Sequence, residues 1–236
     1  MNNEIFNLGD LETAIDFSFK NKNFLKEALT HRSYLNENPG WPISHNERLE
    51  YLGDAVLELV VSEALFKKFP KAPEGQMTVL RAALVNYQML GSVAAGLHLD
   101  DFIFMSRGER GDTSKAREVI LANAIESLIG AIYLDAGLEA VERFTEQFIL
   151  TRLPEILDTK SYRDSKSELQ EIIQEKLKIT PTYGVLEETG PAHQRTFRIG
   201  VYFGGELIAE GMGASKQEAE VEAAKEALLK YRNPNL

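Results

Sequence analysis

Three carboxylates in the segment NERLEYLGDAVLEL are spaced so that they could act together. Its apolar residues recur at three- and four-residue steps without an interior proline, which predicts one helix over residues 45–69 with Asn46 as its N-cap. In that helix Glu47, Glu50 and Asp54 fall within an arc of about 60°. They repel one another, and hard Mg²⁺ would offset that repulsion by accepting several carboxylate oxygens. A solvated acidic face is the alternative interpretation.

The other side of this helix is apolar, which indicates how the acids are positioned. Gly53 lies in mid-helix, where glycine costs about 1 kcal/mol relative to alanine. We therefore expect another part of the chain to pack closely there. The apolar side consists of Leu49, Leu52, Val56, Leu59 and Val60, together with Glu63.

A second helix, predicted over residues 115–134, carries two more polar groups on an apolar background. Asn123 and Glu126 are three residues apart and share one side. A mostly apolar helix does not keep a lone carboxylate without a partner or an ion. Two polar residues on a largely buried helix are the plainer alternative. The residues expected to face the core are Ile125, Leu128, Ile129 and Ile132.

Both segments resemble signature motifs of the ribonuclease III family. The first is normally NERLEFLGDAVL, and Tyr51 replaces the usual phenylalanine. The second is usually LADxxEAxIGAIYLD, and Asn123 stands where the family generally has aspartate. An asparagine still offers a carbonyl oxygen to Mg²⁺ but removes one negative charge, which should lower metal affinity.

The resemblance implies an Mg²⁺-dependent endonuclease for double-stranded RNA, with Mn²⁺ as a substitute metal. Asp54 and Glu126 are expected to be indispensable for catalysis, and Glu47 supports the site from its edge. Glu74 is a candidate for a residue that surrounds the metal ligands without binding the ion. The alternative is a double-stranded RNA-binding protein whose cleavage is impaired by Asn123. The metal ligands implied are Glu50, Asp54, Asn123 and Glu126.

From residue 164 onward the pattern changes to helix, three alternating strands and helix, with Ser215 capping the last helix. This order resembles the double-stranded RNA-binding domain, which reads A-form shape through 2′-hydroxyls and phosphates. Gln217 replaces the second of two lysines usual in that domain, so we expect weaker phosphate binding. By resemblance, the RNA contacts are Gln170 and Gln174 in one minor groove, His193 in the next, and Lys216 on phosphate.

The expected fold is therefore an all-α endonuclease domain (1–157), a linker (158–163) and a small α+β (α-β-β-β-α) RNA-binding domain (164–232). The resemblance further implies a homodimer that cuts both strands and leaves 5′-phosphate and 3′-hydroxyl ends with two-nucleotide overhangs. It also implies a role in processing ribosomal and messenger RNA precursors.

Composition excludes several other classes. The 236 residues include no cysteine and only four histidines without a metal-binding pair, which excludes disulfides and makes a zinc enzyme improbable. No glycine motif for a nucleotide cofactor occurs, and we expect no signal peptide, no membrane association and a cytoplasmic location. The net charge of −10 lies mostly in the first 162 residues. RNA binding must then come from local clusters of basic residues, with marked salt sensitivity.

The remaining segments of the first domain give weaker signals. Two helices are predicted over residues 11–20 and 23–36, with His31 as a structural histidine and Trp41 as the anchor of a turn-rich loop. A helix closed by Pro154 is predicted over residues 138–158. The glycine- and charge-rich residues 107–112 predict a flexible loop facing the substrate.

Overall fold

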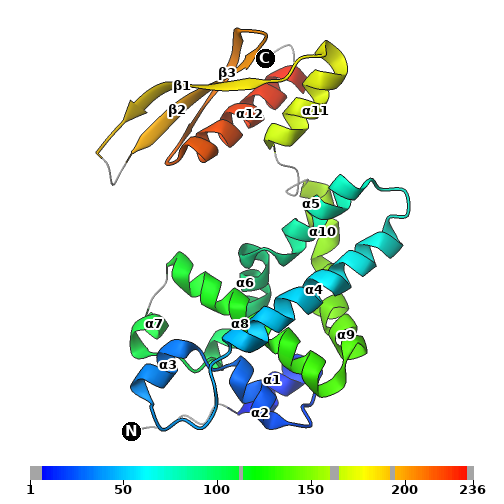
Figure 1. Ribbon diagram of the computed structural model, residues 1–236, viewed down its shortest axis with the longest axis vertical. Coiled ribbons are helices and arrows are strands. Elements are labelled where there is room, and N and C mark those ends of the chain that lie inside the picture. The colour runs from blue at the N-terminus through cyan, green and yellow to red at the C-terminus, as the bar shows by residue number, and fades with distance from the viewer. Residues whose placement is uncertain (1–6, 112–113, 160–164, 192–194, 233–236) are drawn as a thin grey trace. The chain divides into compact units, whose positions relative to one another are not determined.

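The chain forms two compact units, Met1–Tyr162 and Arg163–Leu236. We analysed a computed structural model, which describes residues 7–111, 114–159, 165–191 and 195–232. The first unit is all helical, and the second is a three-stranded sheet with two helices on one of its faces (Figure 1). The expected fold class is confirmed.

Twelve helical segments make up the described part of the first unit. The two longest, α4 (Glu47–Lys68) and α8 (Lys115–Ala136), pack against each other at its centre. The shorter helices surround this pair: α1 (Leu8–Ala14), α2 (Lys22–Ala28), α3 (Arg32–Glu37), α5 (Glu74–Val85), α6 (Tyr87–Gly96), α7 (Arg107–Gly111), α9 (Leu138–Phe148) and α10 (Leu153–Thr159), with 3-10 turns η1 (Leu99–Asp101) and η2 (Leu150–Arg152).

Backbone touches backbone where α4 and α8 cross. A Cβ added at Gly53 would lie 1.8 Å from the carbonyl oxygen of Glu126, and one added at Gly130 would lie 2.3 Å from that of Leu49. The close approach expected at Gly53 is therefore confirmed, and its partner is the helix that carries Glu126.

Helix α8 contributes more buried residues to the core than any other described helix. The sequence predicted no membrane-spanning helix. By length and composition α8 could cross a membrane, but 56% of its apolar stretch is buried inside the protein. All four core residues expected on α8 are buried. On α4 the apolar side is less uniform, because Leu49, Val56 and Val60 are buried whereas Leu59 is 54% exposed.

The helix predicted over residues 23–36 is interrupted between α2 and α3. Thr30 pairs with Phe104 in a parallel bridge, and the amide of His31 donates to the carbonyl of Phe104 at 2.9 Å. This contact is formed by residues more than seventy positions apart, so local periodicity does not report it. His31 then caps α3, its Nδ1 accepting from the amide of Ser33, and its structural role is confirmed.

Three other local predictions are wrong. The first helix, predicted over residues 11–20, is α1, which begins at Leu8 and ends at Ala14. Residues 107–111 form α7 rather than a loop, held by hydrogen bonds from Arg110 to the carbonyl of Ile103 and from Arg117 to that of Glu109. Pro154 does not close a helix. It occupies the first turn of α10, where its missing amide proton costs nothing.

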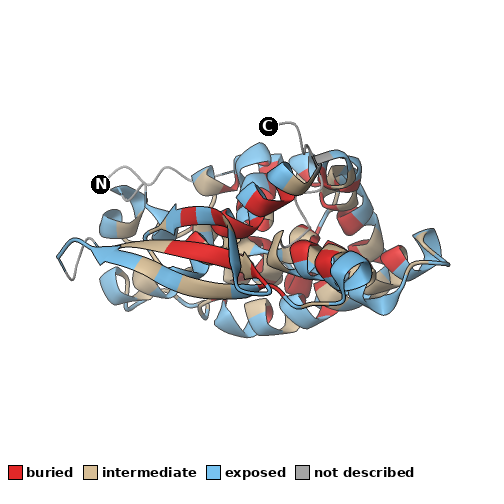
Figure 2. Ribbon diagram, turned by 90° about the horizontal axis from the view of Figure 1, so that it is seen from above, coloured by how far each residue is buried: buried red, intermediate tan, exposed pale blue. Residues whose placement is uncertain are grey.

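The second unit contains α11 (Ser165–Leu177), β1 (Thr182–Thr189), β2 (Thr196–Phe203), β3 (Glu206–Gly213) and α12 (Lys216–Arg232). The strands are antiparallel in the order β1-β2-β3. Strand β3 lies directly on α12, since a Cβ at Gly211 would be 2.1 Å from the amide nitrogen of Ala223. Buried residues follow the inner sides of the helices and the middle of the sheet (Figure 2).

Candidate active site and RNA-binding surface

The first turns of α4 carry the acids predicted from its sequence. Glu47 and Asp54 are exposed, and Glu50 is half-buried. Asn46 precedes the helix but does not cap it with its side chain, which corrects the expectation. The side-chain nitrogen Nδ2 of Asn46 instead donates to the carbonyl of Ala28 at 3.2 Å, which ties the start of α4 to the end of α2.

Helix α8 brings two further groups to these acids. The amide of Asn123 donates a hydrogen bond to Glu50. Glu126 is half-buried, and its burial together with the carboxylates of Asp54 and Glu50 raises its pKa to about 7. Burial, Glu47 and Asp54 also raise the pKa of Glu50, although the bond from Asn123 opposes that shift. Acids from two helices thus share one electrostatic environment.

These four side chains offer the donors that a hard divalent cation prefers, namely three carboxylates and one amide oxygen. Burial and the repulsion from Asp54 and Glu50 both raise the pKa of Glu126, and a bound cation relieves such repulsion, so the residues fit such an ion. Within the described ranges, no three histidine, aspartate or glutamate side chains are already gathered into a metal-binding cluster.

Two other predicted acids have different neighbours. Glu47 contributes to the raised pKa of Glu50. It forms an ion pair with Arg32 at 3.3 Å, and its Oε2 lies 3.8 Å from Nδ1 of His45. Glu74 begins α5, accepts a hydrogen bond from Thr78 at 2.7 Å and borders a hollow near the far end of α4. It is not among the groups that shift the pKa of Glu50 or Glu126.

In the second unit, Gln170 and Gln174 are exposed on α11, and Gln174 donates to Thr180 at 3.2 Å. Lys216 is exposed in the first turn of α12, which Ser215 caps as predicted, and its ammonium lies 5.7 Å from the centre of the Phe197 ring. His193 lies outside the described residues.

Sequence reasoning missed the polar contacts that hold α8 in place. Asp135, at its end, accepts hydrogen bonds from the amides of Lys20 and Asn21 at 2.8 and 2.9 Å and so fixes the start of α2. Ser127, fully buried, donates to the carbonyl of Asn46 at 3.3 Å. In the sequence, Asp135 and Ser127 stand out only as polar residues on an otherwise apolar helix.

Comparison with known proteins agrees with this architecture. Residues 21–153 match the Ribonuclease-III-like family model, and residues 165–231 match the double-stranded RNA binding motif. A protein named Ribonuclease 3 from Desulforamulus reducens is 45% identical over 92% of this chain and 88% of its own. Another, from Nitratiruptor sp., is 44% identical over 96% of this chain and 98% of its own. The chain belongs to the ribonuclease III family.

A solved nuclease domain of ribonuclease III from Campylobacter jejuni also resembles the first unit. It is 44% identical, covers 63% of this chain and 99% of its own, and superposes with a TM-score of 0.57. Its title describes structural flexibility in a region involved in dimer formation. Membership of the ribonuclease III family supports double-stranded RNA as the substrate and an endonuclease as the activity, and the family generally uses divalent metal ions.

Proposed function

We propose that this member of the ribonuclease III family hydrolyses phosphodiesters of double-stranded RNA with Mg²⁺, leaving 5′-phosphate and 3′-hydroxyl ends with two-nucleotide overhangs. One observation carries the proposal: Glu126 on α8 is partly buried beside the carboxylates of Asp54 and Glu50 on α4, and burial together with these two charges raises its pKa to about 7. Precursors of ribosomal and messenger RNA in the cytoplasm are the natural substrates we infer.

The chain's own residues bind the ion and orient the reaction. Glu50, Asp54, Asn123 and Glu126 would hold it, and when bound it offsets charge on the phosphate and activates water for attack on phosphorus. Glu126 releases its proton as it becomes a ligand, so metal binding should strengthen as the pH rises through about 7. Glu47, at the edge of the site, adds negative charge beside Glu50.

The test is cleavage of a long RNA duplex with Mg²⁺ and then with Mn²⁺, followed by analysis of the product ends. Staggered products with 5′-phosphates support the proposal. Duplex binding without products in either metal would instead identify a double-stranded RNA-binding protein impaired by Asn123. The bond from Asn123 to Glu50 is the observation that keeps this second candidate, because it uses one acceptor site of the Glu50 carboxylate and turns the amide NH₂ of Asn123 toward it.

Replacing Asn123 with aspartate is expected to strengthen Mg²⁺ binding. The aspartate adds a negative charge to the ligand set and removes the amide donor to Glu50. We expect the Mg²⁺ concentration for half-maximal cleavage to fall, by roughly 10-fold for a change next to the metal. A metal titration of cleavage rates measures this shift. Loss of activity in Asn123→Asp would show that the ligand assignment is wrong.

Replacing Lys216 with alanine should weaken duplex binding without altering the cleavage chemistry. Lys216 lies at the positive N-terminus of α12, where a phosphate is favoured. We expect weaker binding to RNA duplexes of any sequence. The slope of log affinity against log salt concentration should be smaller in magnitude by about 1. Filter binding at several salt concentrations measures both. Lys225→Ala, which removes an exposed lysine paired with Glu222 on the same helix, is the matched control and should leave the slope unchanged.

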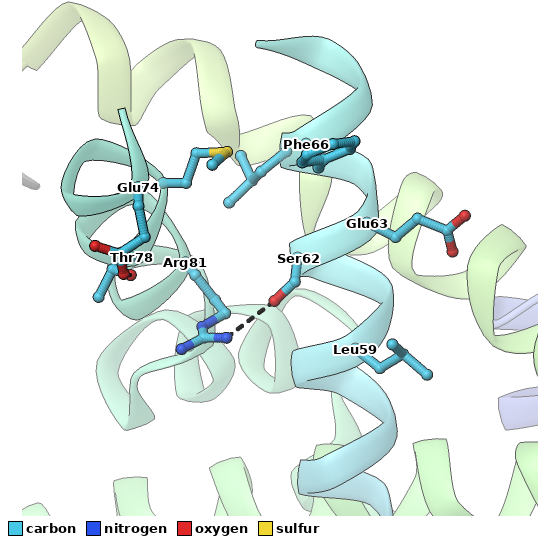
Figure 3. Close-up of a pocket in the computed structure, with 9 residues that line it drawn as sticks. Leu59, Ser62, Glu63, Phe66, Glu74, Thr78 and Arg81 are labelled. Atoms are coloured by element: carbon cyan, nitrogen blue, oxygen red, sulfur yellow. Dashed lines mark hydrogen bonds between the residues drawn. The ribbon is translucent and has the colours of Figure 1, made fainter. Parts of the chain in front are cut away.

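We also propose that the protein acts as a homodimer, with one site for each strand. Apolar side chains on α4 reach solvent, among them Tyr51 (83% exposed), Leu59 and Phe66 (69% exposed). A hollow of about 470 Å³ lies between α4 and α5, and Arg81 donates to Ser62 in its wall at 3.0 Å (Figure 3). In an isologous contact, exposed aromatic side chains of one copy can fill such hollows on the other.

A charge at Tyr51 is expected to separate the subunits. Tyr51→Glu places a carboxylate where we propose an apolar contact, and an unpaired charge is costly to bury there. Sedimentation velocity should show a shift from dimer to monomer at micromolar concentration. Leu229→Glu, which changes an apolar side chain that is 53% exposed on α12, is a comparison variant that should remain dimeric. A monomeric wild type would contradict the proposed dimer.

A further inference from the structure

The start of α4 is held by a polar joint beneath the acids. Asn46 is 3% exposed, and its backbone amide donates to the carbonyl of Thr30 at 2.9 Å. Its side-chain amide donates to the carbonyl of Ala28 at 3.2 Å. The corner between α2 and α3 therefore fixes both the backbone and the side chain of this residue.

Helix α8 joins the same point through Ser127. This serine is fully buried, and its hydroxyl donates to the carbonyl of Asn46 at 3.3 Å. That carbonyl also accepts the amide of Glu50 at 2.9 Å. A serine within a helix usually bonds to its own preceding turn. Here its hydroxyl bonds across to the neighbouring helix instead.

Each partner of this bond is next to an acid in the sequence. Asn46 immediately precedes Glu47, and Ser127 immediately follows Glu126. The carbonyl that receives the Ser127 hydroxyl also closes the helical turn that carries Glu50. The bond therefore links the two backbones that present Glu50 and Glu126, at the end of the helix crossing nearest the site.

At Gly53 and Gly130 the backbones of α4 and α8 meet without intervening side chains. Helices usually lock through ridges of side chains that fit into grooves. The close backbone contact fixes how near the two helices approach at this point. The hydrogen bond from Ser127 to Asn46 adds a directional restraint beside it.

We propose that Ser127 and Asn46 are positioning residues whose hydrogen bond sets the alignment of α8 against α4, and thereby the spacing between Glu126 and the acids Glu50 and Asp54. This inference rests on the proposed function, because the spacing matters only if these acids share a divalent ion. Both residues are buried, so they act through the backbones of the acids and not by binding the ion or the RNA themselves.

The test compares Ser127→Ala with Thr145→Val in the full chain. Both variants remove one fully buried hydroxyl from a helix, but the hydroxyl of Thr145 on α9 has no hydrogen-bond partner among the residues that the structure describes. Mn²⁺ binding is measured by calorimetry without RNA, and cleavage is measured as kcat and KM at saturating metal. Thermal unfolding of each variant reports any general loss of packing.

We expect Ser127→Ala to weaken Mn²⁺ binding and to lower kcat, each by roughly 3- to 10-fold, with KM nearly unchanged, because small misplacements of reacting groups are costly. Thr145→Val should change neither quantity. If Ser127→Ala does not fold, Ser127→Cys keeps the side-chain volume with a much weaker donor and should show the same direction.

Unchanged Mn²⁺ affinity and kcat in a folded Ser127 variant would overturn the proposal, as would equal losses in Ser127→Ala and Thr145→Val. Failure of the proposed function gives a different result. The wild type would then cleave no duplex, whereas the calorimetric comparison of Mn²⁺ binding would still decide whether the joint positions the acids.

Discussion

Glu126→Gln is expected to stabilise the metal-free protein at pH 8 and at the same time to remove most of its cleavage activity. Glu126 is partly buried and faces Asp54 and Glu50, so its negative charge is unfavourable until a cation is bound. Glutamine keeps the shape of the side chain without that charge. Cleavage should fall by at least roughly 10²- to 10³-fold, the loss typical when one preorganised electrostatic group is removed.

The stability effect should depend on pH in a defined window. Burial and neighbouring carboxylates raise the pKa of Glu126 from its ordinary 4.5 to about 7. Between these values the folded protein keeps a proton that the unfolded chain has released, so stability is lost as the pH rises through the window. The gain in the free energy of unfolding from Glu126→Gln should therefore be near zero at pH 4 and grow to roughly 1–2 kcal/mol at pH 8. This is less than the full pKa shift would give, because the carboxyl group is partly exposed.

Urea unfolding at several pH values measures this difference, with the fluorescence of Trp41 as the signal. Trp41 is the only tryptophan, and it packs against Tyr34 and Phe104 in the helical unit, as expected for a loop anchor. Added Mg²⁺ should stabilise the wild type more than the variant. Glu139→Gln is the control, because that carboxylate is 84% exposed on α9 and pairs with Arg143 on the same helix. A pH-independent difference would show that Glu126 does not share the charge of its neighbours.

The helices that carry the acids could be predicted from the sequence because their pattern is local. Spacing alone placed Glu47, Glu50 and Asp54 on one side of α4, and Asn123 and Glu126 on one side of α8. The cost of glycine in mid-helix indicated a close approach at Gly53, which the carbonyl of Glu126 makes. That contact brings the two sides together.

The features that sequence patterns did not predict depend on distant contacts. Asn46 has the residue type of an N-cap, but the carbonyl of Ala28 takes its side-chain donor. The bridge from Thr30 to Phe104 ends α2 early. Glycines at 108 and 111 suggested a loop, yet the hydrogen bonds of Arg110 and Arg117 support a short helix there. In each case a tertiary hydrogen bond outweighs a local preference.

Gly53→Ala is expected to destabilise the fold more than alanine at any other described glycine, because it has the shortest clash among them. The new Cβ would lie 1.8 Å from the carbonyl oxygen of Glu126 and 2.9 Å from the amide nitrogen of Gly130. Backbone atoms cannot rotate away as a side chain can, so α4 and α8 must separate. The clash should cost about 3 kcal/mol or more, which outweighs the gain of about 1 kcal/mol from the better helix propensity of alanine.

The same separation should impair metal binding before the protein unfolds. Because Glu126 lies on the helix that is pushed away, Gly53→Ala should weaken Mn²⁺ binding in any fraction that remains folded. Calorimetry and urea unfolding measure the two effects separately. Gly130→Ala should behave alike, since its Cβ would lie 2.3 Å from the carbonyl oxygen of Leu49.

Gly96→Ala is the matched control for these variants. Gly96 ends α6, and nothing lies within 4 Å of the position its Cβ would take. Alanine there should be neutral or stabilise the protein by up to about 1 kcal/mol through its helix propensity. If Gly53→Ala matched Gly96→Ala in stability and bound Mn²⁺ as the wild type does, α4 and α8 would not be in backbone contact, and the close placement of Glu126 beside Glu50 and Asp54 would have to be abandoned.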